Sequence, residues 1–479
     1  MRKAGALACC LLTGCTVGPD FSAPPPPKVS SFTAGASPDQ AAQNPNWRTG
    51  QDISAQWWTV FQSPQLDALI KDAFQRNPDL AAAQASLRVA MENVKAQRGA
   101  YYPVIGAGLN ADRTKQSAAL SPALSTPDLL YNLYQTQLSV SWTPDIWGAN
   151  RRTVEALQAQ ANAQRYQLES VYVGLAANLV AAAIQEASLR EQISATRDLI
   201  ADERQILEIE TRQRALGQVS GQDVAAQQTI LAQTEASLPP LLKQLAQQRN
   251  LLTVLAGRYP ADQVPQTFQM HDLVLPGELP LSLPSKLVEQ RADIRMAEET
   301  MHAASAEVGV ATANRLPNIT LGVNAGTVAS QLSQLFGPGN EFWSIGAGLT
   351  QPVFDGGTLL HRERAAEAAL DQASASYRSI VLKAFQDVAD TLAAIENDAR
   401  AVQAAETAET SAAKSLSLAK DQLAVGQTGR LAVLNAEAAY LQAKIGAITV
   451  RANRIADSAA LFQALGGGWW NRADKVAVQ

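Results

Sequence analysis

Two stretches of the chain decide the fold: residues 79–110, DLAAAQASLRVAMENVKAQRGAYYPVIGAGLN, and residues 293–324, DIRMAEETMHAASAEVGVATANRLPNITLGVN. They align without a gap at a constant offset of 214 residues, and the identical pairs include Val94 with Val308, Pro103 with Pro317, Ile105 with Ile319, Gly108 with Gly322 and Asn110 with Asn324. Self-similarity at a fixed offset indicates an internal duplication. The chain of 479 residues is therefore predicted to hold two structural repeats, residues 57–270 and residues 271–470, followed by a tail at 471–479.

Each repeat changes its hydrophobic period partway. Residues 65–98 and 285–313 are rich in Ala, Leu, Gln and Glu and predict helices, which give way to strands at Pro103 and Pro317. Strict alternation follows, which predicts four strands per chain. The apolar face of these strands is expected to hold Ile105, Ala107, Leu109, Ala111, Tyr134, Thr136, Leu138, Val140, Trp142, Ile319, Leu321, Val323, Trp343, Ile345, Ala347 and Leu349. The opposite face is expected to hold Gly106, Gly108, Asn110, Asp112, Gln135, Gln137, Ser139, Ser141, Thr320, Gly322, Asn324, Ser344, Gly346, Gly348 and Thr350.

Strands of roughly ten residues with one apolar and one small, polar face are typical of a transmembrane β-barrel. Half-buried hairpins of a soluble protein are the alternative interpretation. The nearly uncharged polar face favours the barrel, because it suits a water-filled lumen, and the linkers 113–130 and 328–341 read as exposed loops. An open sheet of four strands leaves two edges whose backbone groups hydrocarbon cannot satisfy. Several chains are therefore expected to close one barrel.

Unusually long helices are predicted after each hairpin. Residues 148–215 and 357–425 contain no proline, so each helix could extend about 100 Å. Shorter helices, 222–256 and 430–465, are expected to return, with Leu238-Pro239-Pro240-Leu241 interrupting the first of them. The second has an apolar seam of heptad spacing, which predicts lengthwise packing on neighbouring helices. The seam consists of Leu431, Leu434, Ala438, Leu441, Ile445, Ile448, Ala452, Ile455, Ala459 and Phe462.

The first residues have the pattern of an export signal. Arg2 and Lys3 precede a short apolar run that ends in Leu12-Thr13-Gly14-Cys15, and this resembles the lipobox of bacterial lipoproteins. The resemblance implies a signal peptide at 1–14, an S-diacylglycerol and N-palmitoyl modification of Cys15, and a lipid-anchored, Pro-rich segment at 15–56. An ordinary signal peptide with an accidental cysteine is the alternative. All three cysteines lie in the first fifteen residues, so no disulfide framework is expected.

Several other classes of function lack the residues that they need. The net charge of -5 and the absence of a Lys/Arg cluster argue against nucleic-acid binding. The three histidines, His271, His302 and His361, are scattered and have no cysteine partners, so no metal or cofactor is expected. No phosphate-binding loop is present, and Ser220 has the wrong glycine spacing for a catalytic nucleophile. The chain is therefore not expected to be an enzyme.

Taken together, the motifs resemble the TolC-like outer membrane factors, in their lipoprotein (NodT-type) branch that serves tripartite efflux systems with an RND pump. The resemblance runs from Cys15 to about Trp469 and rests on the following motifs: Gly18-Pro19-Asp20-Phe21, Trp57-Trp58, Asn77-Pro78-Asp79-Leu80, Ser237-Leu238-Pro239-Pro240, Leu283-Pro284-Ser285, Arg291-Ala292-Asp293-Ile294-Arg295 and Gln351-Pro352-Val353-Phe354-Asp355-Gly356-Gly357. It implies an α+β tandem-repeat fold and a homotrimer with a twelve-stranded barrel in outer membrane lipid and a long helical periplasmic barrel. It also implies two partners, a periplasmic adaptor (membrane fusion) protein and an inner-membrane RND pump.

The same resemblance implies a periplasmic gate that opens by an iris-like dilation of the helix tips. The tips map to 217–224 and 426–435, where acidic residues of the family commonly stand at the positions of Ala432 and Asn435. Because both side chains are neutral here, closure is expected to depend on packing and neutral hydrogen bonds, with Asp223, Arg430 and Leu431 as the other candidate gate residues. A role of Asp223 as a helix-capping acid is the alternative.

The function implied is a passive exit duct for drugs or other small molecules. A periplasmic coiled-coil adaptor or scaffold lipoprotein without a pore is the alternative, since adaptors also contain long helical hairpins. The duplicated order of helix, hairpin and long helix favours the channel.

Overall fold

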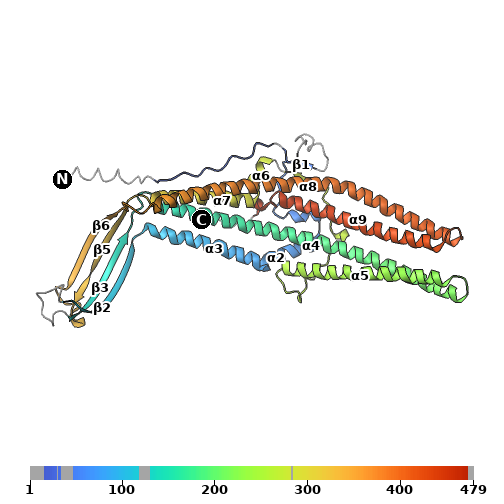
Figure 1. Cartoon of the computed structure of the whole chain (residues 1–479), viewed down its shortest axis with the longest axis horizontal. Helices are drawn as coiled ribbons and strands as arrows, with labels where there is room; N and C mark the ends of the chain where they lie inside the picture. The colour runs from blue at the N-terminus through green and yellow to red at the C-terminus, as the bar shows by residue number, and fades with distance from the viewer. Residues whose placement is uncertain (1–15, 30, 34–46, 118–129, 282–283, 473–479) are drawn as a thin grey trace.

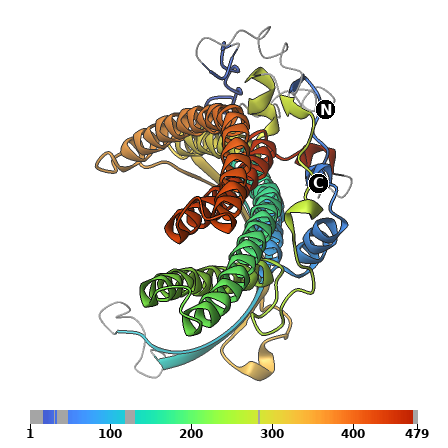
Figure 2. The same ribbon diagram turned by 90° about the vertical axis from the view of Figure 1, so that its right-hand side faces the viewer.

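The computed structural model describes residues 16–29, 31–33, 47–117, 130–281 and 284–472. The described chain is elongated, with a β-sheet at one end and the turns between long helices at the other (Figure 1). Figure 2 shows that the long helices are arranged as a curved wall and not as a closed bundle. A wall of this kind leaves helix faces without a neighbour in the same chain.

The same order of elements occurs twice. The first half contains α2 (Pro64–Arg76), α3 (Pro78–Arg98), β2 (Val104–Lys115), β3 (Leu130–Trp142), α4 (Ala149–Ala215) and α5 (Gly221–Leu255). The second half contains α6 (Pro284–Gln290), α7 (Ala292–Ala313), β5 (Asn318–Ala329), β6 (Glu341–Thr350), α8 (Thr358–Ala424) and α9 (Arg430–Ala464). Both long helices, α4 and α8, have 67 residues, and both returning helices, α5 and α9, have 35.

Two short 3-10 helices flank the sheet: η2 (Gly99–Tyr101) follows α3, and η5 (Leu332–Gln334) lies in the loop between β5 and β6. The other short elements lie around the middle of the helices. They are β1 (Trp47–Thr49), which pairs in parallel with β4 (Leu279–Leu281), and the 3-10 helices η1 (Trp57–Phe61), η4 (Met270–Asp272) and η6 (Trp469–Asn471). The main hydrophobic core also lies here, where η1, α2 and the ends of α5 and α9 pack on α4 and α8. Trp57 stacks on Phe462 with ring centroids 5.4 Å apart, which joins the first residues of one half to the last helix of the other.

The expected helices at 65–98 and 285–313 are each divided in two. Asn77 lies between α2 and α3 in an extended conformation, which the following proline favours, and its side chain accepts hydrogen bonds from the amides of Asp79 and Leu80. Its Nδ2 also donates to the carbonyl of Leu255. Arg291, also extended but without a following proline or a side-chain cap, divides α6 from α7 and donates to the carbonyl of Ala464. Tertiary contacts therefore fix both breaks.

The prediction that Pro239 and Pro240 interrupt the returning helix is wrong, because α5 is continuous from Gly221 to Leu255. Both proline side chains are exposed. The carbonyl groups that lose their helical partners therefore lie on a side of α5 that water can reach, which lowers the cost of the missing hydrogen bonds.

The four long strands form one antiparallel sheet in the order β2-β3-β5-β6, as the alternation predicts. The register pairs Ala107 with Leu138, Leu138 with Ala325, and Ala325 with Trp343, so the expected apolar residues share one face. The polar set shares the other face, where Gln137 donates to Asn324 and Asn324 donates to Ser344. β2 and β5 reach Lys115 and Ala329 and thus extend slightly into the predicted loops, while residues 118–129 lie outside the described ranges.

The heptad seam of α9 is buried in its second half but only in part near the tip. Leu434, Ile448, Ala452, Ile455, Ala459 and Phe462 are buried, but Leu431 and Ala438 are exposed in the single chain. Near the tip α9 also buries Val433 and Glu437, which lie outside the seam. The reason is that α9 contacts both α8 and α4, so its covered face is wider than one seam.

The helix α4 contains a window that is long and apolar enough to cross a membrane. Within the described part of the chain, α4 is the only helix with such a window. More than half of the window is buried against other parts of the protein. Leu175, Leu179, Val180 and Ile184 all belong to the main core. This segment is therefore the core-facing part of a long helix.

Candidate gate at the helix tips

The two helix tips are built alike. A short turn at 216–220 joins α4 to α5, and one at 425–429 joins α8 to α9. Gly217 and Gly426 have the same positive φ of 75°, and the amides of Gln218 and Gln427 donate back to the carbonyls of Gln213 and Gln422, each at 2.9 Å. The sequence match Gly217-Gln218 with Gly426-Gln427 thus corresponds to one helix-ending motif used twice.

Asp223 caps its own helix. Its backbone amide donates to the Ser220 hydroxyl oxygen at 3.2 Å, and its carboxylate accepts from the Ser220 amide at 3.0 Å. Hydrogen bonds from the hydroxyl and the amide of Ser220 lower the pKa of Asp223. The side chain is fully exposed. In the single chain the geometry of Asp223 therefore matches the capping alternative. The Ser220 hydroxyl takes part in the same helix cap.

Arg430 connects the two hairpins. Its guanidinium lies 2.8 Å from the carboxylate of Glu210 on α4 and donates to the side-chain oxygen of Gln227 on α5 at 3.1 Å. Both charged side chains are largely buried. Burial raises the pKa of Glu210 more than Arg430 lowers it, and the carboxylates of Asp223 and Glu437 also raise it. Arg430 is thus the first residue of α9 and a bridge from α9 to both helices of the other hairpin.

Two more buried carboxylates follow behind this bridge. Glu437 of α9 is inaccessible to solvent and lies 3.5 Å from the ammonium group of Lys420 on α8. Glu203 of α4 accepts a hydrogen bond from Thr234 of α5 at 3.0 Å. Burial, followed by the nearby charge of Glu437, raises the pKa of Glu203 above its ordinary value. The contact between the hairpins is therefore rich in buried charge.

Sequence reasoning singled out Arg430 but missed Glu203, Glu210 and Glu437. One signal was available for Glu437, which stands three residues after Leu434 and four before Leu441 and so lies on the apolar side of α9. The other predicted gate residues, Leu431, Ala432 and Asn435, are exposed on α9 and contact neither Asp223 nor Arg430 through a side-chain hydrogen bond or ion pair among the described residues. The structure thus joins Arg430 to the other hairpin and leaves these three side chains at the surface.

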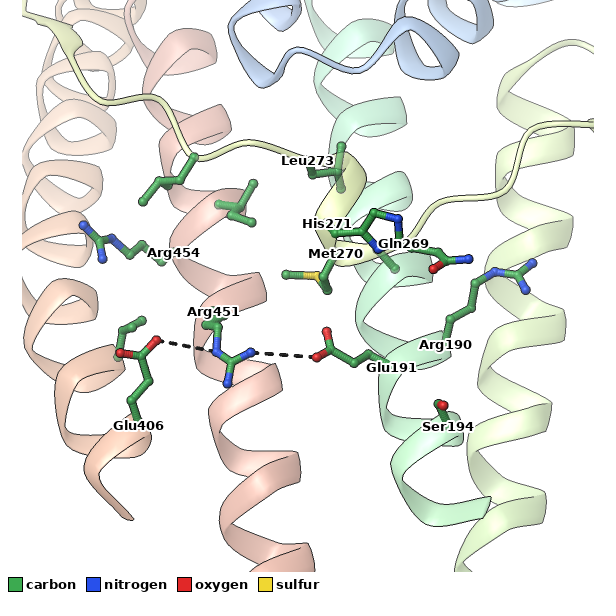
Figure 3. Close-up of a pocket in the computed structure, with 14 residues that line it drawn as sticks. Arg190, Glu191, Ser194, Gln269, Met270, His271, Leu273, Glu406, Arg451 and Arg454 are labelled. Carbon is green, nitrogen blue, oxygen red and sulfur yellow. Dashed lines mark ion pairs between the residues drawn. The ribbon is translucent and has the colours of Figure 1, made fainter. Parts of the chain in front are cut away.

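A second bridge lies near the middle of the helices, beside a cavity of about 740 Å³ (Figure 3). Arg451 of α9 pairs with Glu409 of α8 at 2.7 Å, with Glu406 of α8 at 3.7 Å and with Glu191 of α4 at 3.8 Å. Figure 3 shows Arg451 between Glu406 and Glu191. The hairpins are therefore held together by buried or half-buried arginines at two levels.

The predicted acylation site, Cys15, lies outside the described residues. Within the described ranges, no group of three His, Cys, Asp or Glu side chains is placed to hold a metal ion. His302 instead stacks on Phe21, and His271 lines the cavity beside Arg451.

A transmembrane-type sheet on a wall of long helices defines a class of protein, the outer membrane channels with a helical extension. The chain belongs to the outer membrane efflux protein family, whose model matches residues 69–258 and 283–467. It is 30% identical over 459 residues to the pyoverdine export outer membrane protein OpmQ of Pseudomonas putida, covering 94% of both chains. It is 27% identical over 460 residues to the outer membrane protein OprJ of Pseudomonas aeruginosa, covering 96% of this chain and 94% of that protein.

Solved structures agree with this family. The outer-membrane channel OprN superposes with a TM-score of 0.86 at 27% identity, over 95% of this chain and 100% of that one. The outer membrane protein VceC of Vibrio cholerae superposes with a TM-score of 0.80 at 26% identity, over 87% of this chain and 100% of that one. The predicted TolC-like fold, the outer membrane location and the function as an efflux channel are confirmed. The channel is thereby favoured over an adaptor without a pore.

Proposed function

We propose that three copies of this chain form the passive exit duct of a tripartite efflux pump, working with a periplasmic adaptor and an inner-membrane RND pump. The observation that carries the proposal is the single four-stranded sheet. Its outer strands β2 and β6 each pair with one neighbour only in the described chain. In a bilayer those two edges must be satisfied by other copies, and three copies give the twelve strands that the family resemblance implies.

The polar face of the sheet suits a wide aqueous path. Gln137, Asn324 and Ser344 form a hydrogen-bonded row across three strands. Asp112, near the loop end of β2, is the one ionisable residue of the predicted polar face. A neutral polar wall solvates small molecules without binding one of them strongly, so the duct would accept drugs or other small molecules of varied chemistry.

Opening requires the two hairpins of each copy to move apart at the tip. The bridge from Arg430 to Glu210 and Gln227 crosses this contact, so we assign it as the lock within each copy. Leu431, Ala432 and Asn435 are exposed on the single chain and would meet the neighbouring copies at the constriction. A buried ion pair behind a neutral constriction would depend on salt only weakly, because buried charges are poorly screened.

The remaining parts of the proposal concern anchoring and energy. Cys15 would carry the S-diacylglycerol and N-palmitoyl groups, as its lipobox implies. We assign no catalytic step to this chain, so the partner pump would supply the energy. The alternating period of the strands and the length of the helices support both a membrane-spanning part and a periplasmic part.

The mass of the detergent-solubilised protein tests the assembly, and its conductance in a planar bilayer tests the duct. We expect a mass of three acylated chains and a small resting conductance that rises in the presence of the adaptor. A monomeric mass, or a protein that never conducts with its adaptor present, would contradict the proposal.

A further inference from the structure

The residues that directly follow the predicted acylation site are docked on the helices. The amide of Val17 donates to the carbonyl of Trp147 at 3.1 Å, just before α4 begins. Arg152 of α4, whose side chain is only 4% exposed, donates from Nε to the carbonyl of Val17 at 3.2 Å. It also donates to the carbonyl of Gly18 at 3.3 Å and to the carboxylate of Asp20 at 2.8 Å. One buried guanidinium thus holds two backbone carbonyls and one carboxylate of the leading segment, all within residues 17–20.

Glycines make this close approach possible. Gly18 has a φ of +92°, and a Cβ atom there would lie 2.3 Å from the Cα of Gly309 in α7. A Cβ atom on Gly309 would lie 2.9 Å from the Cγ of Arg152. Glycine inside a helix lowers helix stability relative to alanine. The close contacts with Arg152 and Gly18 therefore explain why a glycine, and not a residue with a Cβ atom, stands at position 309.

A second contact fixes the end of the same segment. Phe21 stacks on the ring of His302 in α7, with centroids 4.3 Å apart and planes 13° from parallel. His302 Nε2 lies 3.0 Å from the carboxylate of Glu155, which also accepts a hydrogen bond from Arg152 at 2.8 Å. The two contacts are thus joined through Glu155 and act as one seat.

We propose that Arg152 and Gly309 form a docking seat that fixes where the lipid anchor enters the membrane. This inference rests on the proposed acylation of Cys15. Two peptide units separate position 15 from Val17, and they span at most about 7 Å. Val17 is bound to Trp147, five residues after the end of β3 at Trp142. The acyl chains therefore enter the inner leaflet beside the barrel wall, and Arg152 is a positioning residue for the anchor.

Chymotrypsin cleavage after Phe21 in the full-length mature protein in detergent micelles tests the seat. We expect Gly309→Ala to accelerate this cleavage at least tenfold, because the new methyl group displaces Arg152. The same substitution should leave the unfolding temperature unchanged or higher, since alanine favours the helix. Gly174→Ala is the matched control, because a Cβ atom on this helical glycine meets nothing within 4 Å. Chymotrypsin should cleave this control variant at the wild-type rate.

Arg152→Ala should accelerate cleavage as Gly309→Ala does, and Arg152→Lys should restore protection only in part, because lysine lacks the planar fork of donors. If Arg152→Ala does not fold, Gly309→Ala decides the outcome. Wild-type cleavage rates in Gly309→Ala would overturn the seat. The mass of the released fragment tests the anchor separately: an unmodified fragment would overturn acylation and with it the positioned anchor, whatever the cleavage rates are.

Discussion

At the scale of single residues, charge is concentrated where helices of different hairpins meet. Arg430 and Arg451 belong to the last helix, and each reaches carboxylates on α4. Within the second hairpin, between α8 and α9, burial and the neighbouring carboxyl of Asp398, to which protonated Asp457 can donate, raise the pKa of Asp457 to about 6. Breaking contacts of this kind leaves a buried charge without a partner, which costs more than the contact itself stabilises. These residues are therefore the positions where a single change should alter the gate.

Arg430→Ala should make the resting channel leaky. The change leaves Glu210 buried without its cation, which costs about 3 kcal/mol by analogy with other buried pairs. The hairpin contact should weaken, and single-channel conductance at rest should rise. Asp223→Ala removes a capping acid at the surface and should leave the resting conductance near the wild-type value.

Lys414→Ala, which removes an exposed cation from α8, is the control for a change in net charge. If Asp223→Ala leaks as much as Arg430→Ala, then Asp223 acts at the gate and the assignment of the lock to Arg430 and Glu210 is incomplete.

At the scale of elements, the sequence predicted the helices and strands whose formation depends on local hydrophobic period and proline content. The period of two predicted the strands and their faces, and the absence of proline predicted α4 and α8. The break at Asn77 has a local signal in the proline that follows it, whereas Arg291 makes no side-chain cap and is bound to the distant carbonyl of Ala464. The partners of Arg430 were missed because Glu210 and Gln227 are far from it in sequence.

The two faces of the sheet should respond differently to the same charge. Leu138→Arg places a cation on the apolar face of β3 and should cost about 2–4 kcal/mol at mid-bilayer. Gln137→Arg, one residue earlier, points to the polar face and should be far milder, although it loses the hydrogen bond to Asn324. Heat-modifiable migration of refolded protein on a gel measures both, and equal damage would mean that the sheet does not surround a lumen.

At the scale of the whole molecule, the proposed barrel and the proposed acyl anchor would give one chain two attachments to the outer membrane. The barrel would span the membrane through an apolar band on every strand, whereas an acyl anchor inserts into one leaflet only. The docked segment from Val17 to Phe21 would join the two attachments, because it is bound at the start of α4 by Trp147 and Arg152 and on α7 by His302. Losing the lipid should therefore change how the leading segment is held and not whether the protein is embedded.

Cys15→Ser tests this separation of roles. The substituted protein should lack the acyl groups by mass spectrometry of its N-terminal region, yet it should still fractionate with the outer membrane and migrate as a heat-modifiable oligomer. The physical reason is that burying the apolar face of the proposed twelve-stranded barrel would stabilise membrane insertion far more than the acyl chains, each worth about 0.8 kcal/mol per buried CH₂ group. The double variant with Cys15→Ser and Leu138→Arg is the comparison, because Leu138→Arg weakens the barrel itself. A fully soluble Cys15→Ser protein would show that the lipid, and not the sheet, holds this chain in the membrane.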